Sequence, residues 1–481
     1  MQLFWLRSDL RHLDNTALSA AAARGPTLAV YVISPQQWRM HDDAACKVDF
    51  WLRNVHTLSE RLRPLNIPLL IRTAATWEDV PSVLLTLCQE QGIQALHTNQ
   101  EYGINETRRD TAVAQTLEAH GIAFHSYLDQ LLFQPGSVLT QSGSYFQVFS
   151  QFRRVCYNRL HMALPQTLAA PAAQAPLNIQ SDPVPAAIDG FATPNDALRA
   201  LWPAGEEEAQ IRLARFADEH IHYYQDERDL PAKPGTSQLS AYLAAGVISP
   251  RQCLHAALMS NNGEFESGSP GAFTWITELL WREFYKHILV GYPRVSRHRA
   301  FRPETEFMPW REAPQELAAW KQGRTGFPII DAAIRQLLET GWMHNRLRMV
   351  VAMFLTKNLL IDWREGERFF MQHLIDGDLA ANNGGWQWSS STGTDSVPYF
   401  RIFNPLSQSE RFDPEGTFIK HWLPELADLN KKQVHNPASV GGLFGAVNYP
   451  APIVNLSQSR DRALSAFKNL PTRHMLEMSH D

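Results

Sequence analysis

The sequence predicts an α/β domain followed by an all-α region. Three observations support this. Residues 1–130 alternate short apolar runs with amphipathic ones, residues 163–190 are rich in Pro and Ala without apolar periodicity, and the pattern from residue 206 onward is helical almost throughout. A chain of 481 residues is also too long for one ordinary core. We therefore expect a domain at 1–130, an interdomain linker at 131–205 and a helical domain at 206–481.

The N-terminal domain is predicted to be Rossmann-like, with a doubly wound parallel sheet. Strands are expected at 2–6, 27–33, 68–72, 94–99 and 122–127, with helices at 15–24, 47–63, 77–91 and 105–120. Strands separated by helices of this length imply right-handed crossovers. No G-x-G-x-x-G follows the first strand, so the usual dinucleotide fingerprint is absent.

The second domain is predicted to be helical from its apolar periodicity. The expected helices are 206–224, 249–259, 273–289, 326–341 and 345–361.

Composition limits the class of protein. The chain is 44% hydrophobic and 19% charged, as in globular proteins, and no run of about 18 apolar residues occurs. The apolar start meets Arg7 and Asp9 too soon for a signal peptide, so a cytoplasmic protein without membrane contact is expected. Four scattered cysteines without a C-x-x-C pair indicate neither disulfides nor a metal site. A net charge of −5 argues against broad nucleic-acid binding, although totals hide local patches.

The stretch DGDLAANNGGWQWSSSTGTD at 376–395 is the strongest candidate for a site. Asn-Asn-Gly-Gly is typical of a turn or loop, whereas two tryptophans around Gln387 normally pack in a core. This mixture predicts a binding site on a loop.

The expected helix 273–289 is apolar on nearly every face and should be buried. Glu278 is therefore expected away from bulk water, as a carboxyl that contacts a ligand between Trp275 and Trp281. The alternative is an ordinary Glu278–Arg282 ion pair one helical turn apart.

A basic segment follows this helix. It is either a phosphate-binding face or a merely solvated surface. Its cations are Lys286, Arg294, Arg297, Arg299 and Arg302.

GTSQLSAYLAAG at 235–246 places Thr236, Ser237 and Ser240 at a helix start. These hydroxyls either cap the helix or cradle a phosphate.

GWMHNRLRMVVAMFL at 341–355 places Asn345, Met349 and Met353 on one helix face. Such methionines usually belong to a core. A buried Arg348 would need a carboxylate, which Asp376 or Asp378 could provide.

Tryptophans also recur at Trp310, Trp363 and Trp386. Each could be an ordinary core residue, but indole is easily oxidised by one electron. An aligned set would conduct electrons.

Several of these motifs together resemble the photolyase/cryptochrome flavoproteins over essentially the whole chain, and most of all the bacterial class I cyclobutane pyrimidine dimer photolyases. The motifs are RSDLRHLDN (7–15), GTSQLS, WITELLWREFYKH, GWMHNRLRM, DWREGE and the 376–395 stretch. The resemblance implies a light-driven carbon–carbon lyase that repairs DNA, and FAD held by the helical domain.

Carried over motif by motif, the resemblance assigns FAD-binding residues. Asn382 would face the central nitrogen of the flavin ring, and Trp386, Trp363 and Trp310 would relay electrons from the surface. The FAD-binding residues would be Tyr224, Thr236, Ser237, Gln238, Leu239, Ser240, Trp275, Asn345, Arg348, Asp376, Gly377 and Asp378.

The implied substrate is DNA that contains a cyclobutane pyrimidine dimer, flipped out of the duplex. Glu278 would stabilise the dimer radical anion. The other DNA-contacting residues would be Arg228, Trp281, Arg282, Asn345, Arg346, Met349, Met353, Trp388 and Gln408.

The family also carries an antenna chromophore. Asn105, Glu106, Ser296 and Arg297 resemble a folate-type site for methenyltetrahydrofolate, although relatives with folate commonly have Lys at the position of Arg297. The RSDLRHLDN segment is otherwise explained as a salt-bridged turn with Asp14 as helix cap.

Two other functions stay open at this stage: a cryptochrome-like light sensor without repair, and repair restricted to single-stranded DNA. Glu278 and Asn382 favour repair, and Asn345 and Met349 replace the histidines of six-four photolyases. The chain ends at LEMSHD without the long tail of many cryptochromes. A monomer is expected.

Overall fold

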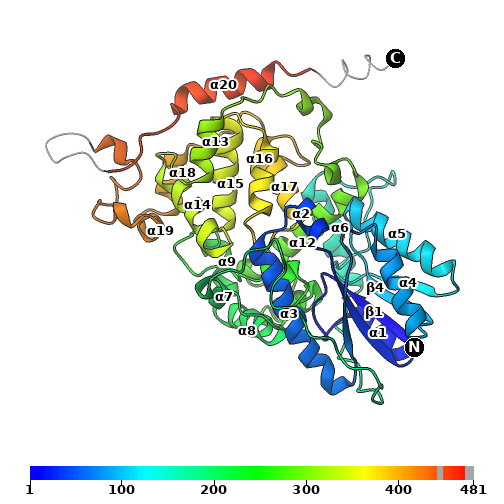
Figure 1. Cartoon of the computed structure of the whole chain (residues 1–481). Coiled ribbons are helices and arrows are strands. Elements are labelled where there is room, and N and C mark those ends of the chain that lie inside the picture. The colour runs from blue at the N-terminus through cyan, green and yellow to red at the C-terminus, as the bar shows by residue number, and fades with distance from the viewer. Residues whose placement is uncertain (441–447, 472–481) are drawn as a thin grey trace. The chain divides into compact units, whose positions relative to one another are not determined.

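The computed structural model describes residues 1–440 and 448–471, and the LEMSHD end lies outside them (Figure 1). The described chain forms two compact units. Unit 1 comprises Met1–Gln225, Ser237–Pro293 and Ile375–Asp378, and unit 2 comprises Asp226–Thr236, Arg294–Leu374 and Leu379–Asp481. Each is described by itself below. The domain boundaries expected from the sequence stay a prediction.

Unit 1 contains a five-stranded parallel sheet with strand order β3-β2-β1-β4-β5. Because the order reverses at β1, right-handed crossovers place helices on both faces. The α/β prediction is confirmed, and each expected strand is present. The strands are β1 (Gln2–Leu6), β2 (Thr27–Ile33), β3 (Leu69–Thr73), β4 (Ala95–Asn99) and β5 (Ala123–Tyr127).

Strands β1, β2 and β4 are largely buried, and β3 is buried at Leu69 and Leu70 only. Such burial is typical of a parallel sheet covered by helices on both faces. One helix pair, α4 and α5, packs together over the sheet (Figure 1). The short helix α2 was not expected from the sequence. The helices of this part are α1 (Thr16–Arg24), α2 (Pro35–Met40), α3 (Ala45–Leu62), α4 (Val80–Glu90) and α5 (Ile104–Glu118).

Residues 163–190 contain no helix or strand, as the Pro-rich composition predicts. The expected linker 131–205 is not irregular throughout, since it contains α6 (Phe149–Met162) and α7 (Asp196–Leu201). Phe152 of α6 is buried, and its ring lies 5.4 Å from that of Phe284. The amphipathic pattern of α6 was the overlooked signal.

The rest of the described chain is helical, as predicted. Two of the expected helices change geometry part-way, into π-helical turns at Phe216–His220 and Phe354–Asn358. The remaining α-helices are α8 (Glu206–Arg215), α9 (Tyr224–Glu227), α10 (Ser240–Ala244), α11 (Pro250–Ser260), α12 (Pro270–Gly291), α13 (Pro314–Lys321), α14 (Pro328–Thr340), α15 (Asn345–Met353), α16 (Trp363–Met371), α17 (Leu379–Ser390), α18 (Pro405–Phe412), α19 (Thr417–Trp422) and α20 (Leu456–Lys468).

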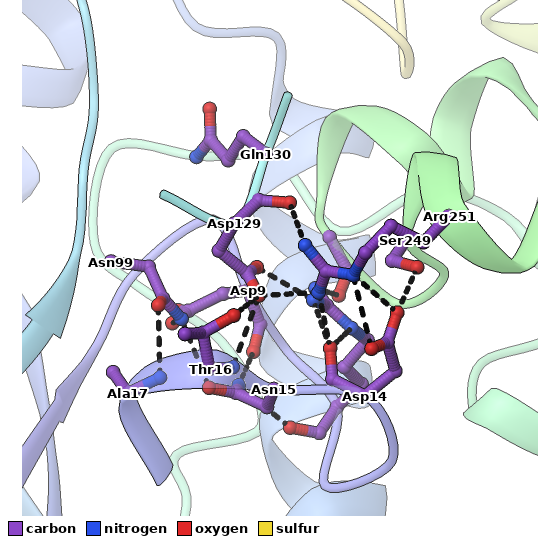
Figure 2. A network of polar contacts seen from close by, with 12 residues as sticks. Asp9, Asp14, Asn15, Thr16, Ala17, Asn99, Asp129, Gln130, Ser249 and Arg251 are labelled. Carbon is purple, nitrogen blue, oxygen red and sulfur yellow. Dashed lines mark hydrogen bonds and ion pairs between the residues drawn. The ribbon is translucent and has the colours of Figure 1, made fainter. Parts of the chain in front are cut away.

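A buried ionic network follows β1, where open α/β sheets commonly bind ligands (Figure 2). Asp129 accepts from Arg11 at 2.6 Å and from Arg251 at 2.9 Å. Asp14 pairs with Arg251 at 3.0 Å and accepts from the Ser249 hydroxyl. These buried charged side chains therefore satisfy one another.

The network corrects the expected role of Asp14. The cap of α1 is Asn15, whose side chain accepts from the Leu18 amide. Asp14 instead has a positive φ of 50° and turns its carboxylate toward Arg251. The salt-bridged turn is thus present, and we call Arg11, Asp14, Asp129 and Arg251 the ionic network.

Candidate functional site

Helix α12 of unit 1 carries the predicted aromatic walls. It begins after Ser269, whose hydroxyl caps the Ala272 amide. Trp275 is buried, with its ring 5.0 Å from that of Phe216. Trp281 stacks on Phe149 at 3.6 Å, with 13° between the planes. Both indoles are therefore held in place by neighbouring rings.

The expectation for Glu278 is only partly met, because this residue is half-buried and not removed from water. The fully buried carboxyl of α12 is Glu283, which accepts from the amides of Leu132 at 2.6 Å and Phe133 at 3.3 Å. Burial raises the pKa of Glu283 to about 7. Both acids lie on a helix that is apolar all round, and only the structure shows which one faces the interior. Arg282 donates to the Gln130 carbonyl at 2.6 Å.

The segment 236–239 leads into helix α10. The N-cap of α10 is Leu239, whose side chain makes no capping hydrogen bond, so none of the three predicted hydroxyl residues is the N-cap. Ser237 and Ser240 are half-buried in unit 1, and Gln238 is exposed with a positive φ of 51°. Tyr224, which precedes this segment in the sequence, is buried, and its ring lies 5.7 Å from that of Phe216. Thr236, which belongs to unit 2, is also half-buried.

The predicted basic face is smaller than expected. Lys286 is buried in an ion pair with Asp378, so it is not part of a solvated cationic surface. Gly377 lies between Asp378 and the buried Asp376.

The other cations of this segment belong to unit 2. Arg302 is exposed and paired with Glu304 at 2.9 Å, and Arg294 lies 3.7 Å from Glu306. Arg297 and Arg299 are exposed, and Ser296 is buried. Acidic neighbours thus reduce the charge available to a phosphate.

The tryptophan-rich stretch is a helix in the structure, so the predicted loop at Asn-Asn-Gly-Gly is wrong. Buried contacts of α17 override its poor helix propensity. Asn383 donates to the Glu367 carboxylate at 3.0 Å, and Gln387 donates to Asn383 at 2.8 Å. Gln387 also accepts from the Phe301 amide at 2.7 Å. These amides anchor α17 within unit 2.

Asn382 is half-buried, and its side-chain nitrogen donates to the Glu367 carbonyl of α16 at 3.0 Å. This contact fixes the orientation of the amide, because only nitrogen can donate. The side-chain oxygen is then the atom suited to accept a hydrogen bond from a ligand. An aspartate here would place a carboxylate against the Glu367 carbonyl.

The three predicted relay tryptophans all belong to one apolar core in unit 2. Trp363 and Trp386 are buried in it, and the half-buried Trp310 packs against it. Sequence reasoning missed Trp320, which is fully buried with its ring 6.0 Å from that of Trp386. Trp320 lies in a polar, amphipathic segment of the sequence, and this pattern did not indicate that its ring is buried beside Trp386.

Close packing of α16 on α17 depends on Gly366. A Cβ atom at this position would lie 2.0 Å from the Trp386 ring. Trp386 therefore rests directly on the helix that begins with Trp363. We call Trp310, Trp320, Trp363 and Trp386 the tryptophan core.

Burial increases along one face of helix α15. Asn345 is exposed, Met349 is half-buried, and Met353 is buried, where its sulfur accepts from the Phe403 amide at 3.2 Å. Arg348 is half-buried and donates to the Met343 carbonyl at 2.7 Å. Its predicted partner, Asp376 or Asp378, stays a prediction.

The remaining DNA candidates are partly accessible. Arg346 pairs with Asp229 at 2.6 Å, and Arg228 lies 3.9 Å from the same carboxylate. Trp388 and Gln408 are half-buried.

The antenna candidates Asn105 and Glu106 begin helix α5 of unit 1. Asn105 is exposed and bonds His41 at 3.0 Å. The Glu106 carboxyl folds against Gly103, where an added Cβ would lie 1.9 Å from Oε2. Burial of this carboxyl, reinforced by Glu101, raises the pKa of Glu106 to about 7.

Searches within residues 1–440 and 448–471 find no group of three or more His, Cys, Asp and Glu side chains that could hold a metal ion. No helix in these ranges is both long and apolar enough to span a bilayer.

Comparison with known families identifies the class of protein. The DNA photolyase model matches residues 2–172, and the FAD binding domain of DNA photolyase matches residues 275–469. The chain is thus built from an α/β photolyase domain and an FAD-binding helical domain. It belongs to the DNA photolyase family.

Full-length relatives agree. The chain is 43% identical to a deoxyribodipyrimidine photo-lyase of Salmonella typhimurium, over 97% of this chain and 98% of that protein. It is 42% identical to the Escherichia coli protein of the same name, over the same shares. These relatives confirm the predicted family and class of enzyme.

Solved structures share the fold. A bacterial class III photolyase from Agrobacterium tumefaciens matches with a TM-score of 0.87 and 33% identity, over 97% of both chains. A cryptochrome of Synechocystis matches with a TM-score of 0.84 and 27% identity, over 96% of this chain and 98% of that one. The fold alone therefore does not separate repair from sensing.

Proposed function

We propose that this protein is a light-driven enzyme that splits cyclobutane pyrimidine dimers in DNA. The observation that carries the proposal is full-length identity above 40% to two deoxyribodipyrimidine photo-lyases. Glu278 and Asn382, which favour repair over sensing, support it.

FAD is the proposed cofactor, consistent with the FAD-binding domain at 275–469. In its reduced form this cofactor would supply the light-driven electron transfer that opens the ring of the dimer. The residues proposed to hold it are Tyr224, Thr236, Ser237, Gln238, Leu239, Ser240, Trp275, Asn345, Arg348, Asp376, Gly377 and Asp378.

Asn382 has the donor and acceptor arrangement that suits a reduced flavin. Its nitrogen donates to the Glu367 carbonyl, which would leave its oxygen to accept a hydrogen bond from the N–H group of the central flavin ring. Because α16 fixes the amide, this contact is prepared before the cofactor binds.

Glu278 is proposed to form a hydrogen bond with the dimer and to stabilise the negative charge that develops there during cleavage. A half-buried position suits this role, since the group is reachable by the substrate and is covered once the substrate binds. Trp281, Trp388, Met349 and Met353 would form the apolar wall. Arg228, Arg282, Arg346 and Gln408 would contact the DNA backbone or neighbouring groups.

The tryptophan core is proposed to reduce the flavin under light. Trp386, Trp363 and Trp310 share one core, and Trp310 is the half-buried member that can exchange electrons with solvent. Trp386 and Trp363 are shielded from water, which limits side reactions of an oxidised indole.

An antenna pigment, methenyltetrahydrofolate, is proposed at Asn105, Glu106 and Arg297. A neutral Glu106 near pH 7 could donate a hydrogen bond to a pterin ring. An archaeal photolyase from Sulfolobus tokodaii, 30% identical with a TM-score of 0.78, was solved with two FAD molecules. A monomeric state and a cytoplasmic location stay predictions.

The direct test is a repair assay. The purified protein, reduced without oxygen, is illuminated with an oligonucleotide that contains one thymine dimer, and the product is separated by chromatography. Restoration of thymines in the light but not in the dark is expected. Bound FAD without repair would instead identify a light sensor.

Glu278→Ala should lower the repair yield per absorbed photon several-fold, because the developing charge loses its hydrogen bond. FAD content and dimer affinity should stay close to those of the parent. Glu266→Ala, which removes an exposed carboxylate before the same helix, is the matched control. An unchanged yield in the Glu278 variant would remove this residue from the mechanism.

A further inference from the structure

The segment 397–404 lies between α17 and α18 and contains no helix or strand. Its first residue, Val397, donates from its amide to the Trp388 carbonyl at 3.3 Å. Near its end, the Phe403 amide donates to the Met353 sulfur at 3.2 Å. Trp388 and Met353 are both proposed for the wall that receives the dimer. We call this segment the wall loop.

The tip of the wall loop projects into solvent. Phe400 is 61% exposed, and Arg401 beside it is exposed as well. An exposed Phe400 ring adds little packing energy to the wall loop. The backbone of the tip must therefore be held by other contacts.

Lys357 contacts the backbone of the tip. Its Nζ donates to the Arg401 carbonyl at 2.9 Å and lies 3.5 Å from the Tyr399 carbonyl, so it grips the chain on both sides of Phe400. The side chain is fully buried, and Nζ lies 5.9 Å from the Phe467 ring of α20. A buried ammonium is costly unless it is hydrogen-bonded, so these contacts are the reason the lysine is tolerated.

Lys357 occupies the π-helical turn Phe354–Asn358, which follows directly on α15. Such turns reorient a side chain and frequently occur at functional sites. The same helix carries Met353 and Met349. One element thus positions the wall methionines and the wall loop together.

On the residue next to Lys357, the Asn358 carbonyl accepts from Arg462 of α20 at 2.6 Å. Within the described ranges no carboxylate pairs with Lys357. Burial lowers the pKa of Lys357 to about 7. The ammonium therefore loses its proton near neutral pH, and neutral amines make weaker hydrogen bonds to carbonyl oxygens.

We propose that Lys357 is a positioning residue that clamps the wall loop against Trp388 and Met353 and thereby sets the affinity for the dimer. This inference rests on the proposed function. The clamp acts on substrate binding, and it acts neither on FAD binding nor on the electron relay.

Replacement of the clamp tests the proposal. Lys357→Met removes the donors at similar length, and its Kd for a dimer-containing oligonucleotide should be about tenfold higher, the size of one charge-assisted hydrogen bond. FAD content and flavin photoreduction should match the parent. From pH 6 to 8.5 the parent's Kd should rise more steeply than the variant's, because only the parent loses the clamping charge. Equal Kd values with equal pH profiles would overturn the proposal.

A second measurement keeps the test decisive if Lys357→Met folds poorly. Trypsin cleaves after exposed arginines, so cleavage after Arg401 of the parent reports loop release. After normalisation to a peptide substrate, cleavage should accelerate as pH rises through about 7. A rate that does not change with pH would contradict the clamp. Failure of the parent to repair dimers at any pH would count against the proposed function and not against the clamp.

Discussion

The two units bury very different clusters. In unit 1, the ionic network places two arginines and two aspartates out of water, each held by several hydrogen bonds. In unit 2, the tryptophan core gathers four indole rings, and the Arg364 guanidinium lies 4.7 Å from the centroid of the Trp363 ring. The buried charges of the ionic network fix its geometry, because each charge needs a partner. The indole rings of the tryptophan core are neutral and need no ionic partner, so they can carry a transient charge.

The pKa of Asp129 shows that the arginines of the ionic network keep a buried carboxylate charged. Burial alone would raise it, but Arg11 and Arg251 outweigh burial and hold the pKa at about 2. Asp9 lies beside the network, and there burial prevails and raises the pKa to about 6. The difference follows from the number of cations that face each carboxylate.

The largest effect is expected from Asp129→Ala, which leaves two buried arginines without their shared carboxylate. The free energy of unfolding should fall by about 3–5 kcal/mol. Urea denaturation measures this change. Glu60→Ala removes an exposed carboxylate paired with Arg63 at 2.6 Å, and should cost less than about 1 kcal/mol. Equal losses in the two variants would show that the ionic network contributes no more than a surface pair.

Gly366→Ala should have a smaller effect on stability and a specific effect on the tryptophan core. The added methyl group would overlap the Trp386 ring and force α16 and α17 apart, at a cost of about 1–3 kcal/mol. The midpoint temperature of thermal unfolding and the rate of flavin photoreduction should both fall.

Gly385→Ala is the matched control on α17, because an added Cβ there meets no atom within 4 Å. Helix propensity should make this variant equal to the parent or up to about 1 kcal/mol more stable. If Gly366→Ala behaves like Gly385→Ala, Trp386 does not depend on close helix packing.

The sequence predicted the sheet and many of the helices, because their apolar periodicity is strong. It failed where tertiary contacts override local preference. The Asn-Asn-Gly-Gly stretch reads as a loop, yet Asn383 and Gln387 form buried hydrogen bonds that stabilise a helix. No local pattern contains the position of Glu367, which supplies one of those contacts.

The candidate site was predicted in part. Motifs identified Asn382, Trp363 and Trp386, and the structure adds the carbonyl that orients Asn382 and the ring of Trp320 beside Trp386. Glu283 and Lys357 were missed, because burial of a single charged residue depends on what packs over it. Lys286 was assigned to the surface for the same reason.

The claim that the tryptophan core conducts electrons while the ionic network only holds structure is tested most directly by Trp310→Phe. Phenylalanine keeps the packing but is much harder to oxidise. Light-driven reduction of oxidised flavin should be lost, and repair by chemically reduced enzyme should be retained. Trp422→Phe, at another partly buried tryptophan packed on the same core, should leave both unchanged. Photoreduction that persists at the parent's rate in Trp310→Phe would contradict the proposed relay.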